Sequence, residues 1–194
     1  MITIIDYKAG NVGSLKNAIE SLGFSCQITS DPQKIGRAEK IIFPGQGRAG
    51  SAMKELRKRG IDKIIKKIKA PFLGICLGMQ LLADYSVEDK TRGLAIIPGD
   101  VFKFGNGLRV PQIGWNSVRI KNNPPLFRGI NNNEYFYFIH SYYFAAPEQY
   151  VVGRTDYGIG FVSALQKDNY YAVQFHPEKS GEAGLKLLRN FCLL

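Results

Sequence analysis

A cysteine between two glycines has the surroundings best suited to chemistry in this chain. Cys76 stands in Gly74-Ile75-Cys76-Leu77-Gly78, which has the form G-x-nucleophile-x-G. An apolar run precedes it and a helical pattern follows, so the pentapeptide predicts a sharp strand-to-helix turn that presents the thiol. The helix N-terminus would favour a thiolate, and the amide of Leu77 could stabilise an oxyanion. A free cysteine is more often buried packing, which we expect for Cys26 and Cys192, but the flanking glycines favour a nucleophile at Cys76.

His176 is the candidate base for this thiol. It ends the run Tyr-Ala-Val-Gln-Phe that begins at position 171, and Glu178 follows two residues later. Residues two apart on an extended chain point to the same side, and Pro177 favours an extended His176. A carboxylate beside an imidazole fixes its tautomer and supports its charged form, as in a triad. Taken alone, His176 could simply end a strand near an exposed glutamate. Together with the cysteine turn, the spacing favours a Cys-His-Glu set.

The first half of the chain alternates short apolar runs with helical patterns. We expect strands at 2–5, 24–29, 40–43 and 71–75, and helices at about 12–22, from Pro32, in the basic stretch from Lys54, and at 77–83. Asp31 offers an N-cap before the proline at the first helical position. Strands that alternate with helices predict βαβ units and a parallel sheet.

After Gly93 the pattern changes to turn residues that separate short aromatic and β-branched runs. One such turn is Gly105-Asn106-Gly107, and the clearest strands are expected at 135–144, 150–153, 161–166 and 170–175, before a final helix at 182–193. These runs predict antiparallel strands and hairpins. The expected fold is therefore α/β, with a mostly parallel central sheet flanked by helices and antiparallel hairpins in the second half. Residues 1–194 show no repeat or linker and are expected to form a single domain.

Composition argues against several classes of protein. Three cysteines without a CxxC pair argue against a disulfide framework and a thiolate zinc site, and two histidines argue against a histidine-rich metal centre. The N-terminus has no basic lead-in or small-residue cleavage site, and no apolar run is long enough for a membrane span. The sequence therefore predicts a cytoplasmic protein without a metal or membrane attachment.

The formal charge of +10 admits a nucleic-acid or other anionic partner. Much of this charge lies between Lys54 and Lys69, where basic residues alternate with Leu56 and four isoleucines at helical spacing. This spacing is typical of a solvated helix face over a buried stripe, and we expect no nucleic acid. An RNA-binding module remains the non-enzymatic alternative, and its binding would weaken steeply with salt.

Two glycine-rich stretches resemble nucleotide sites without completing them. Gly45-Gln46-Gly47-Arg48-Ala49-Gly50 matches G-x-G-x-x-G, but the next strand ends without the acidic residue that would hold a ribose. The stretch from Gly10 to Lys16 only approaches a P-loop and is expected to be a plain turn. We therefore expect no cofactor.

The two motifs together resemble those of class I glutamine amidotransferases. Gly74-Ile-Cys-Leu-Gly-Met-Gln80 resembles the nucleophile motif of that family, and Gln174-Phe-His-Pro-Glu178 resembles its His-Pro-Glu motif. More narrowly, the chain resembles the glutaminase subunits of imidazole glycerol phosphate synthases, a likeness that spans nearly the whole chain. It includes the segments 5–7 with Gly10-Asn11, 44–47, 114–116, 135–142 and 176–180.

The resemblance implies a flavodoxin-like fold and glutamine hydrolysis by Cys76, His176 and Glu178. It implies oxyanion donors at the amides near Gln46 and Leu77. The glutamine-binding residues that it implies are Gly45, Gln46, Gly47, Leu77, Gln80, Ser141 and Tyr142.

The implied partner is a (β/α)8-barrel synthase subunit, which takes the ammonia and makes imidazole glycerol phosphate and AICAR in histidine biosynthesis. The two chains would form a heterodimer, with Trp115 and Lys179 near the docking face.

Two residues depart from the family pattern, and the first of them bears on the ammonia acceptor. Gln46 stands where the family usually has valine, beside the oxyanion site, and Gln112 stands where many relatives carry histidine. The Gln46 change keeps open a paralogous glutaminase that feeds another synthase, such as one making amidated sugars. A thiol hydrolase or peptidase on a similar fold is a further alternative. Gln80 and the segment 140–142 favour glutamine over it through the resemblance alone.

Overall fold

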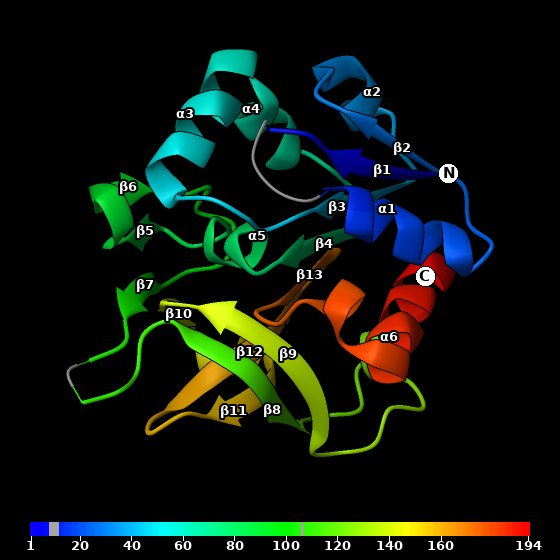
Figure 1. The fold of residues 1–194 in the computed structure, drawn as a ribbon. Coiled ribbons are helices and arrows are strands. Elements are labelled where there is room, and N and C mark those ends of the chain that lie inside the picture. Colours follow the sequence, from blue (N-terminus) through cyan, green and yellow to red (C-terminus); the bar gives the residue numbers. More distant parts are fainter. Residues whose placement is uncertain (8–11, 106) are drawn as a thin grey trace.

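The computed structural model describes residues 1–7, 12–105 and 107–194 (Figure 1). Three features expected from the sequence fall wholly or partly outside these residues. They are the Gly10-Asn11 motif, the P-loop-like stretch that begins at Gly10, and the turn at 105–107.

A nine-stranded sheet with the order β2-β1-β3-β4-β13-β12-β11-β8-β9 forms the centre of the molecule (Figure 1). Its first part is parallel and contains β1 (Ile2–Ile5), β2 (Cys26–Thr29), β3 (Lys40–Phe43), β4 (Phe72–Ile75) and β13 (Tyr170–Val173). The α/β class is therefore confirmed.

The second part of the sheet is antiparallel and begins at β13. It continues through β12 (Gly160–Lys167), β11 (Val151–Asp156), β8 (Gln112–Ile120) and β9 (Glu134–His140). The run at 170–175 was expected among the antiparallel hairpins, but β13 is antiparallel only to β12 and pairs in parallel with β4. Sequence patterning does not specify a pairing between strands about 100 residues apart. The sheet is consequently mixed, with β13 joining its two parts.

Helices cover the parallel part on both faces (Figure 1). α1 (Val12–Ser21) and α6 (Gly181–Leu193) pack against one face, where Ile4 and Ile42 are buried. α3 (Ala49–Arg59) and α4 (Ile61–Ile65) pack against the other face, where Ile41 and Phe43 are buried. No helix in the described ranges is long and apolar enough to cross a membrane.

The short helix α2 (Pro32–Gly36) begins as the sequence predicts. The side chain of Asp31 accepts a hydrogen bond from the amide of Gln33, and Pro32 occupies the first helical position. An Asp at the N-cap satisfies an otherwise orphaned helix amide. The expected cap is confirmed.

The basic stretch lies on the outer side of α3 and α4. Its lysines at 54, 58, 63, 66, 67 and 69 are exposed, whereas Leu56, Ile61 and Ile65 are buried. Charged residues on one side and apolar residues on the other are typical of a helix that covers a core. The prediction of a solvated helix face is confirmed.

The segment after Cys76 is less helical than expected. α5 contains only Leu77–Gln80, although the sequence predicted a helix through Ala83. The carbonyl groups of residues 81–83 instead accept hydrogen bonds from the amides of residues 94–97. The amides of Leu82 and Ala83 donate to carbonyl oxygens three residues back, at Met79 and Gln80, so the α-helical hydrogen-bond pattern is not continued.

A second, four-stranded sheet flanks the first, with the order β10-β7-β5-β6 (Figure 1). Its strands are β10 (Tyr142–Ala145), β7 (Asp100–Lys103), β5 (Tyr85–Ser86) and β6 (Thr91–Arg92). The prediction of one continuous strand at 135–144 is therefore wrong. The strand is interrupted at Ser141, where the chain passes from β9 into β10. The carbonyl oxygen of Ser141 accepts a hydrogen bond from the amide of Phe104 between these two strands.

Gly184 allows α6 to lie against the turn that follows His176. A Cβ atom at Gly184 would lie 2.0 Å from the carbonyl oxygen of Pro177, and backbone cannot yield there cheaply. We expect Gly184→Ala to destabilise the fold by roughly 1–3 kcal/mol, even though alanine favours a helix by about 1 kcal/mol over glycine. The melting temperature should fall by several degrees, at about 2–4 °C per kcal/mol for a chain of this size. Gly160→Ala is the control, because a Cβ atom there meets open space; equal melting temperatures would contradict the prediction.

Candidate active site

Cys76 sits at a strained turn between β4 and α5. Its backbone angles are φ 50° and ψ −107°, a conformation that costs a non-glycine residue energy. The glycines near Cys76 allow the backbone of neighbouring segments to approach the turn closely. A Cβ atom at Gly78 would lie 2.3 Å from the carbonyl oxygen of Phe43. A Cβ atom at Gly45 would lie 1.8 Å from the carbonyl oxygen of Ile75. The structure therefore has the nucleophile-type turn that the pentapeptide predicts.

The sulfur of Cys76 lies against polar groups from two other strands. Nε2 of Gln174 donates to Sγ at 3.4 Å, and Sγ lies 3.9 Å from the carbonyl oxygen of Ile139. The Nε2 of Gln80 donates to Oε1 of Gln174 at 3.0 Å and to the carbonyl oxygen of Tyr142 at 2.9 Å. A chain of amide hydrogen bonds thus joins Gln80 to the thiol. Gln174 was quoted in the sequence motif, but its position there gave no sign of this contact.

His176 and Glu178 form a buried hydrogen-bonded pair. Nδ1 of His176 donates to Oε1 of Glu178 at 2.8 Å, and the two side chains are 2% and 7% exposed. His176 is extended, but Pro177–Lys179 forms a turn of 3-10 helix, so Glu178 reaches the ring by a tight turn and not along an extended chain. Proline fits the first position of such a turn because its φ is fixed near the helical value.

The pKa of His176 rises to about 10 through these neighbours. Burial of the ring opposes its charged form, but the charge of Cys76, a hydrogen bond with Cys76 and the carboxylate of Glu178 outweigh burial. The imidazole is therefore held protonated beside the sulfur at neutral pH. A protonated imidazole beside a thiol favours the thiolate and can later donate a proton to a leaving group.

The backbone of His176 is held by β9 and by Ser180. The amide of His176 donates to the carbonyl oxygen of Tyr137 at 2.9 Å. The hydroxyl of Ser180 donates to the carbonyl oxygen of His176 at 2.7 Å and accepts from the amide of Tyr137 at 2.9 Å. Strand β9 and the His-Pro-Glu turn are consequently one connected unit.

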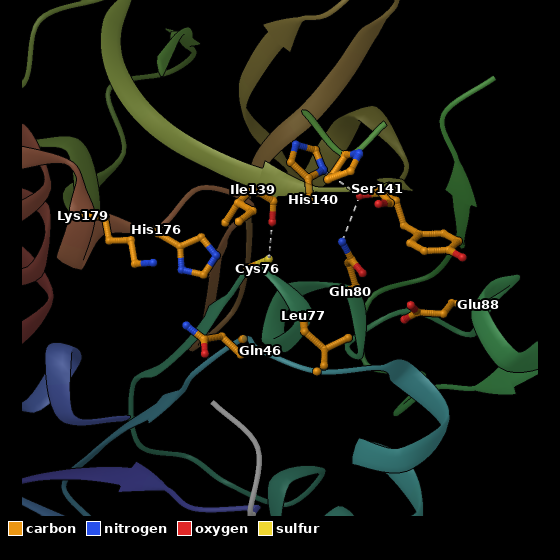
Figure 2. A pocket seen from close by; sticks show the side chains of 14 residues that line it. Gln46, Cys76, Leu77, Gln80, Glu88, Ile139, His140, Ser141, His176 and Lys179 are labelled. Atoms are coloured by element: carbon orange, nitrogen blue, oxygen red, sulfur yellow. Dashed lines mark hydrogen bonds between the residues drawn. The ribbon is translucent and has the colours of Figure 1, made fainter. Parts of the chain in front are cut away.

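A cavity of about 430 Å³ opens above Cys76 (Figure 2). The ring of His176 lies on one side of the thiol, with Lys179 beyond it, while Gln80 and then Glu88 lie on the other side. Glu178 is behind His176 and does not line the cavity, and neither does Trp115. The sequence-predicted residues that line it are Gly45, Gln46, Gly47, Cys76, Leu77, Gln80, Ser141, Tyr142, His176 and Lys179.

Four further lining residues were not predicted, namely Glu88, Pro111, Ile139 and His140. Glu88 accepts a hydrogen bond from the amide of Ala49 at 2.8 Å through Oε2, and burial raises its pKa. It belongs to a short 3-10 turn, Glu88–Lys90, in a segment without a motif. Its place in the cavity depends on a contact across about 40 residues, which sequence reasoning could not supply.

His140 is kept neutral, and both of its ring nitrogens have polar partners. Burial lowers its pKa to about 4. Its Nδ1 lies 2.8 Å from the carbonyl oxygen of Tyr142, and its Nε2 lies 3.1 Å from the side-chain amide of Gln112. A neutral ring donates from Nδ1 to the carbonyl, and Nε2 then accepts from Gln112 when the amide turns its NH₂ group inward. With both nitrogens engaged, His140 orients the Tyr142 segment.

The two amides expected to stabilise an oxyanion differ in their surroundings. The amide of Leu77 makes no hydrogen bond with any described part of the chain. The amide of Gln46, however, donates to the hydroxyl of Tyr7 at 3.0 Å. Among the described residues, the amide of Gln46 therefore has a hydrogen-bond partner and that of Leu77 has none.

Trp115 and Lys179 meet over the ring of Tyr137 on the outer face of β8 and β9. The Trp115 ring packs edge-on to Tyr137 with 6.1 Å between centroids, and Nζ of Lys179 lies 6.0 Å from the Tyr137 ring centre. Ile113, Trp115 and Tyr135 are each more than half exposed on this face. Surfaces that bind other proteins often carry large exposed apolar side chains grouped in this way. We call this surface the β8–β9 face.

The described residues include no group of three or more His, Cys, Asp or Glu side chains placed to hold a metal ion.

Comparison with known proteins identifies the family. The sequence profile of glutamine amidotransferase class-I matches residues 3–194. The chain belongs to the class I glutamine amidotransferase family. This amidotransferase is 50% identical to the imidazole glycerol phosphate synthase subunit HisH of Methanocaldococcus jannaschii, over 98% of each chain. It is 48% identical to that of Maridesulfovibrio salexigens, over 98% of this chain and 95% of the relative.

Solved structures agree on the fold of the amidotransferase. A glutamine amidotransferase crystal structure superposes with a TM-score of 0.79, over 100% of this chain and 98% of that chain, at 19% identity. A chain of PurLQS from Thermotoga maritima superposes with a TM-score of 0.76, over 99% of this chain and 97% of that chain, at 18% identity. At this level of identity the likeness concerns the fold alone.

The charge of Glu178 should set the alkaline limit of activity. Because His176 has its pKa raised from 6.5 to about 10, it keeps its proton through neutral pH and loses it as the pH passes that value. In Glu178→Gln a neutral amide replaces the carboxylate that supports the imidazolium. The pKa of His176 should then fall, and the alkaline limb of the profile of kcat/KM against pH should move down by about one pH unit or more.

Glu182→Gln is the matched control for this measurement, since Glu182 is exposed at the start of α6. Its pH profile should overlay that of the native enzyme. An alkaline limb in Glu178→Gln that stays in place or moves up would show that the carboxylate does not support the charge of His176.

Proposed function

We propose that this amidotransferase is the glutaminase subunit of an imidazole glycerol phosphate synthase, in histidine biosynthesis. The chemistry is supported by one observation, the thiol of Cys76 beside the buried His176–Glu178 pair at the floor of a cavity. The pathway is supported by relatives of that name that are about half identical over nearly the full length. Residues 1–194 would act as one amidotransferase domain in the cytoplasm, where thiols stay reduced.

The reaction begins with attack by the Cys76 thiolate on the side-chain carbonyl carbon of glutamine. A carbon–sulfur bond forms, and the carbonyl π electrons move to the oxygen. His176 protonates the departing nitrogen as the carbon–nitrogen bond breaks, which releases ammonia and leaves a glutamyl thioester. Neutral His176 then takes a proton from water, which attacks the thioester. The thioester bond breaks, glutamate leaves, and the thiolate and imidazolium are restored.

Glutamine fits the cavity in one direction. Its amide must lie at Cys76 and His176, so its amino-acid end extends past Gln80 toward Glu88 (Figure 2). The carboxylate of Glu88 suits a positively charged α-ammonium group, and a partly buried ion pair of this kind fixes orientation. Gln80, which is hydrogen-bonded to Gln174, would hold the side chain of the substrate near the thiol.

The ammonia would pass to a (β/α)8-barrel synthase subunit docked on the β8–β9 face as a heterodimer. This face lies directly above the reacting groups, because Ile139 is exposed there while its carbonyl contacts the sulfur of Cys76. Trp115 would be the main apolar anchor and Lys179 would lie at the rim. A paralogous glutaminase that serves another synthase, such as one making amidated sugars, would use the same site with a different acceptor.

Glutamate release from glutamine tests the chemistry. The chain should release glutamate slowly alone and faster with a barrel synthase and its nucleotide ligand, and Cys76→Ala should abolish release in both cases. Cys26→Ala is the matched control, since Cys26 lies in β2 away from the cavity. Full activity in Cys76→Ala would overturn the proposed mechanism. If the chain is folded and active but this synthase never stimulates it, the ammonia acceptor would instead be a paralogous synthase.

The anchor role of Trp115 has its own test. Trp115→Ala should weaken binding to the synthase by about 2 kcal/mol or more, roughly a 30-fold rise in Kd, as is typical of a central aromatic anchor. Calorimetry measures the Kd, and alkylation of Cys76 by iodoacetamide should be unchanged. Ile28→Ala is the control, because Ile28 is similarly apolar and exposed but lies on β2 at the opposite edge of the sheet. Equal affinities for the two variants would place the interface elsewhere.

A further inference from the structure

We infer that Gln174 is a further catalytic residue, whose side-chain amide donates a hydrogen bond to the sulfur of Cys76 and stabilises the thiolate. The inference rests on the proposed function, because it concerns the nucleophile of amide hydrolysis. It adds a residue to that function, since Gln174 lies outside the Cys-His-Glu set and does not line the cavity.

The end of β13 directs Gln174 and His176 to the same side of the chain. The amide of Gln174 donates to the carbonyl oxygen of Ser163 at 2.9 Å, so the pairing of β13 with β12 continues through this residue. Side chains alternate along an extended chain, and His176 lies two residues after Gln174. Nε2 of Gln174 lies 3.4 Å from Sγ of Cys76, and the ring of His176 is also hydrogen-bonded to Cys76. The sulfur therefore meets two side chains from the end of one strand.

The neighbouring hydrogen bonds fix which end of the Gln174 amide faces the sulfur. The carbonyl oxygen of Tyr142 can only accept, so the group of Gln80 that lies 2.9 Å from it is the NH₂ group. The same NH₂ group lies 3.0 Å from the amide of Gln174, which must present its oxygen there. The NH₂ group of Gln174 is then the one that faces Sγ, and the sulfur is the acceptor.

The contact between Gln174 and Cys76 is buried, which makes it selective for the charged sulfur. Gln174 is fully buried and Gln80 is 5% exposed. A buried amide is destabilising unless its polar atoms are paired, and the sulfur is the partner of this NH₂ group. A neutral thiol is a weak acceptor, whereas a hydrogen bond to an ionised acceptor is about twice as strong as a neutral one. The donor therefore favours the thiolate over the thiol.

A carbonyl beside the sulfur has the opposite effect. The carbonyl oxygen of Ile139, 3.9 Å from Sγ, can accept from a neutral thiol but repels a negative charge. Gln174 and the protonated ring of His176 offset this repulsion. Gln174 faces the sulfur again when the glutamyl thioester breaks and the electron pair of the carbon–sulfur bond returns to the sulfur. The same donor thus serves the attack on glutamine and the release of glutamate.

Gln174→Met tests the inference, because methionine is similar in length and removes the donor. With the synthase bound, kcat for glutamate release should fall by about ten- to hundredfold, the factor that a hydrogen bond to a charged group is worth. KM for glutamine should change little, since Gln80 keeps its hydrogen bond to the carbonyl oxygen of Tyr142. The matched control is Ser163→Ala on the paired strand β12, because the buried hydroxyl of Ser163 has no hydrogen-bond partner among the described residues. Its kcat should equal that of the native chain.

The pH dependence of alkylation separates a chemical role of Gln174 from a structural one. Iodoacetamide reacts with the thiolate, so the alkylation rate falls on the acid side as the sulfur gains a proton. Without the donor the thiolate is less stable, and the acid limb in Gln174→Met should move up by about one pH unit or more. Gln174→Glu should move the limb further in the same direction, because its carboxylate can still accept from Gln80 but brings a negative charge to the sulfur. Loss of packing alone would lower the rate at every pH and leave the limb in place.

Alkylation of Cys76 needs neither glutamine nor the synthase, so it also separates the inference from the proposed function. If native chain and synthase together release no glutamate, the proposed function fails and the acid limb still decides the role of Gln174. A folded Gln174→Met or Gln174→Glu variant whose acid limb stays in place would overturn the inference, whatever its kcat.

Discussion

The parallel pairing of β13 with β4 is the constraint on which the site depends. Val173 lies opposite Ile75 in this pair, and the amide of Cys76 donates to the carbonyl oxygen of Val173 at 2.7 Å. Both strands end at the same edge of the sheet, so the residues that follow them, Cys76 and His176, emerge side by side. The two candidate reacting groups are 100 positions apart in the sequence, and only this register brings a thiol and an imidazole into contact.

The local parts of this arrangement could be predicted from the sequence because their causes are local. Glycines around Cys76 permit the close approach of β3 that the turn requires, and Asp31 before a proline begins a helix wherever it occurs. The parts that sequence reasoning missed depend on distant partners. Gln174, Glu88 and Tyr7 have ordinary neighbours in the chain, and each acquires its role from a group between 39 and 98 residues away. The break at Ser141 was missed for the same reason, since both strands beside it have strand-like composition.

Burial lowers the pKa of both histidines, but the net shifts are opposite because the neighbouring charges differ. His140 and His176 are both almost inaccessible to solvent, yet the pKa of the first falls to about 4 and that of the second rises to about 10. The hydrogen-bond partners of His140 are uncharged, so the cost of burying a charge dominates its pKa, and the charge of His176 lowers that pKa further. His176 faces Glu178 and the sulfur of Cys76, whose charges outweigh that cost. Composition alone showed two candidate histidines, and only the charges around each ring distinguish a base from a structural residue.

Strand β9 connects the outer surface to the reacting groups. Tyr137 contributes its ring to the β8–β9 face and its carbonyl to the amide of His176, while Ile139 is exposed on that face and directs its carbonyl at the sulfur of Cys76. A partner that shifts β9 must therefore move neighbours of both reacting groups. The loop of residues 44–47 also packs against Cys76, and the amide of Gln46 in this loop donates to the hydroxyl of Tyr7, which follows β1. A shift of β9 that repositions the thiol also changes what the backbone of Gly45 packs against, because Gly45 lies directly on Ile75, Cys76 and Leu77.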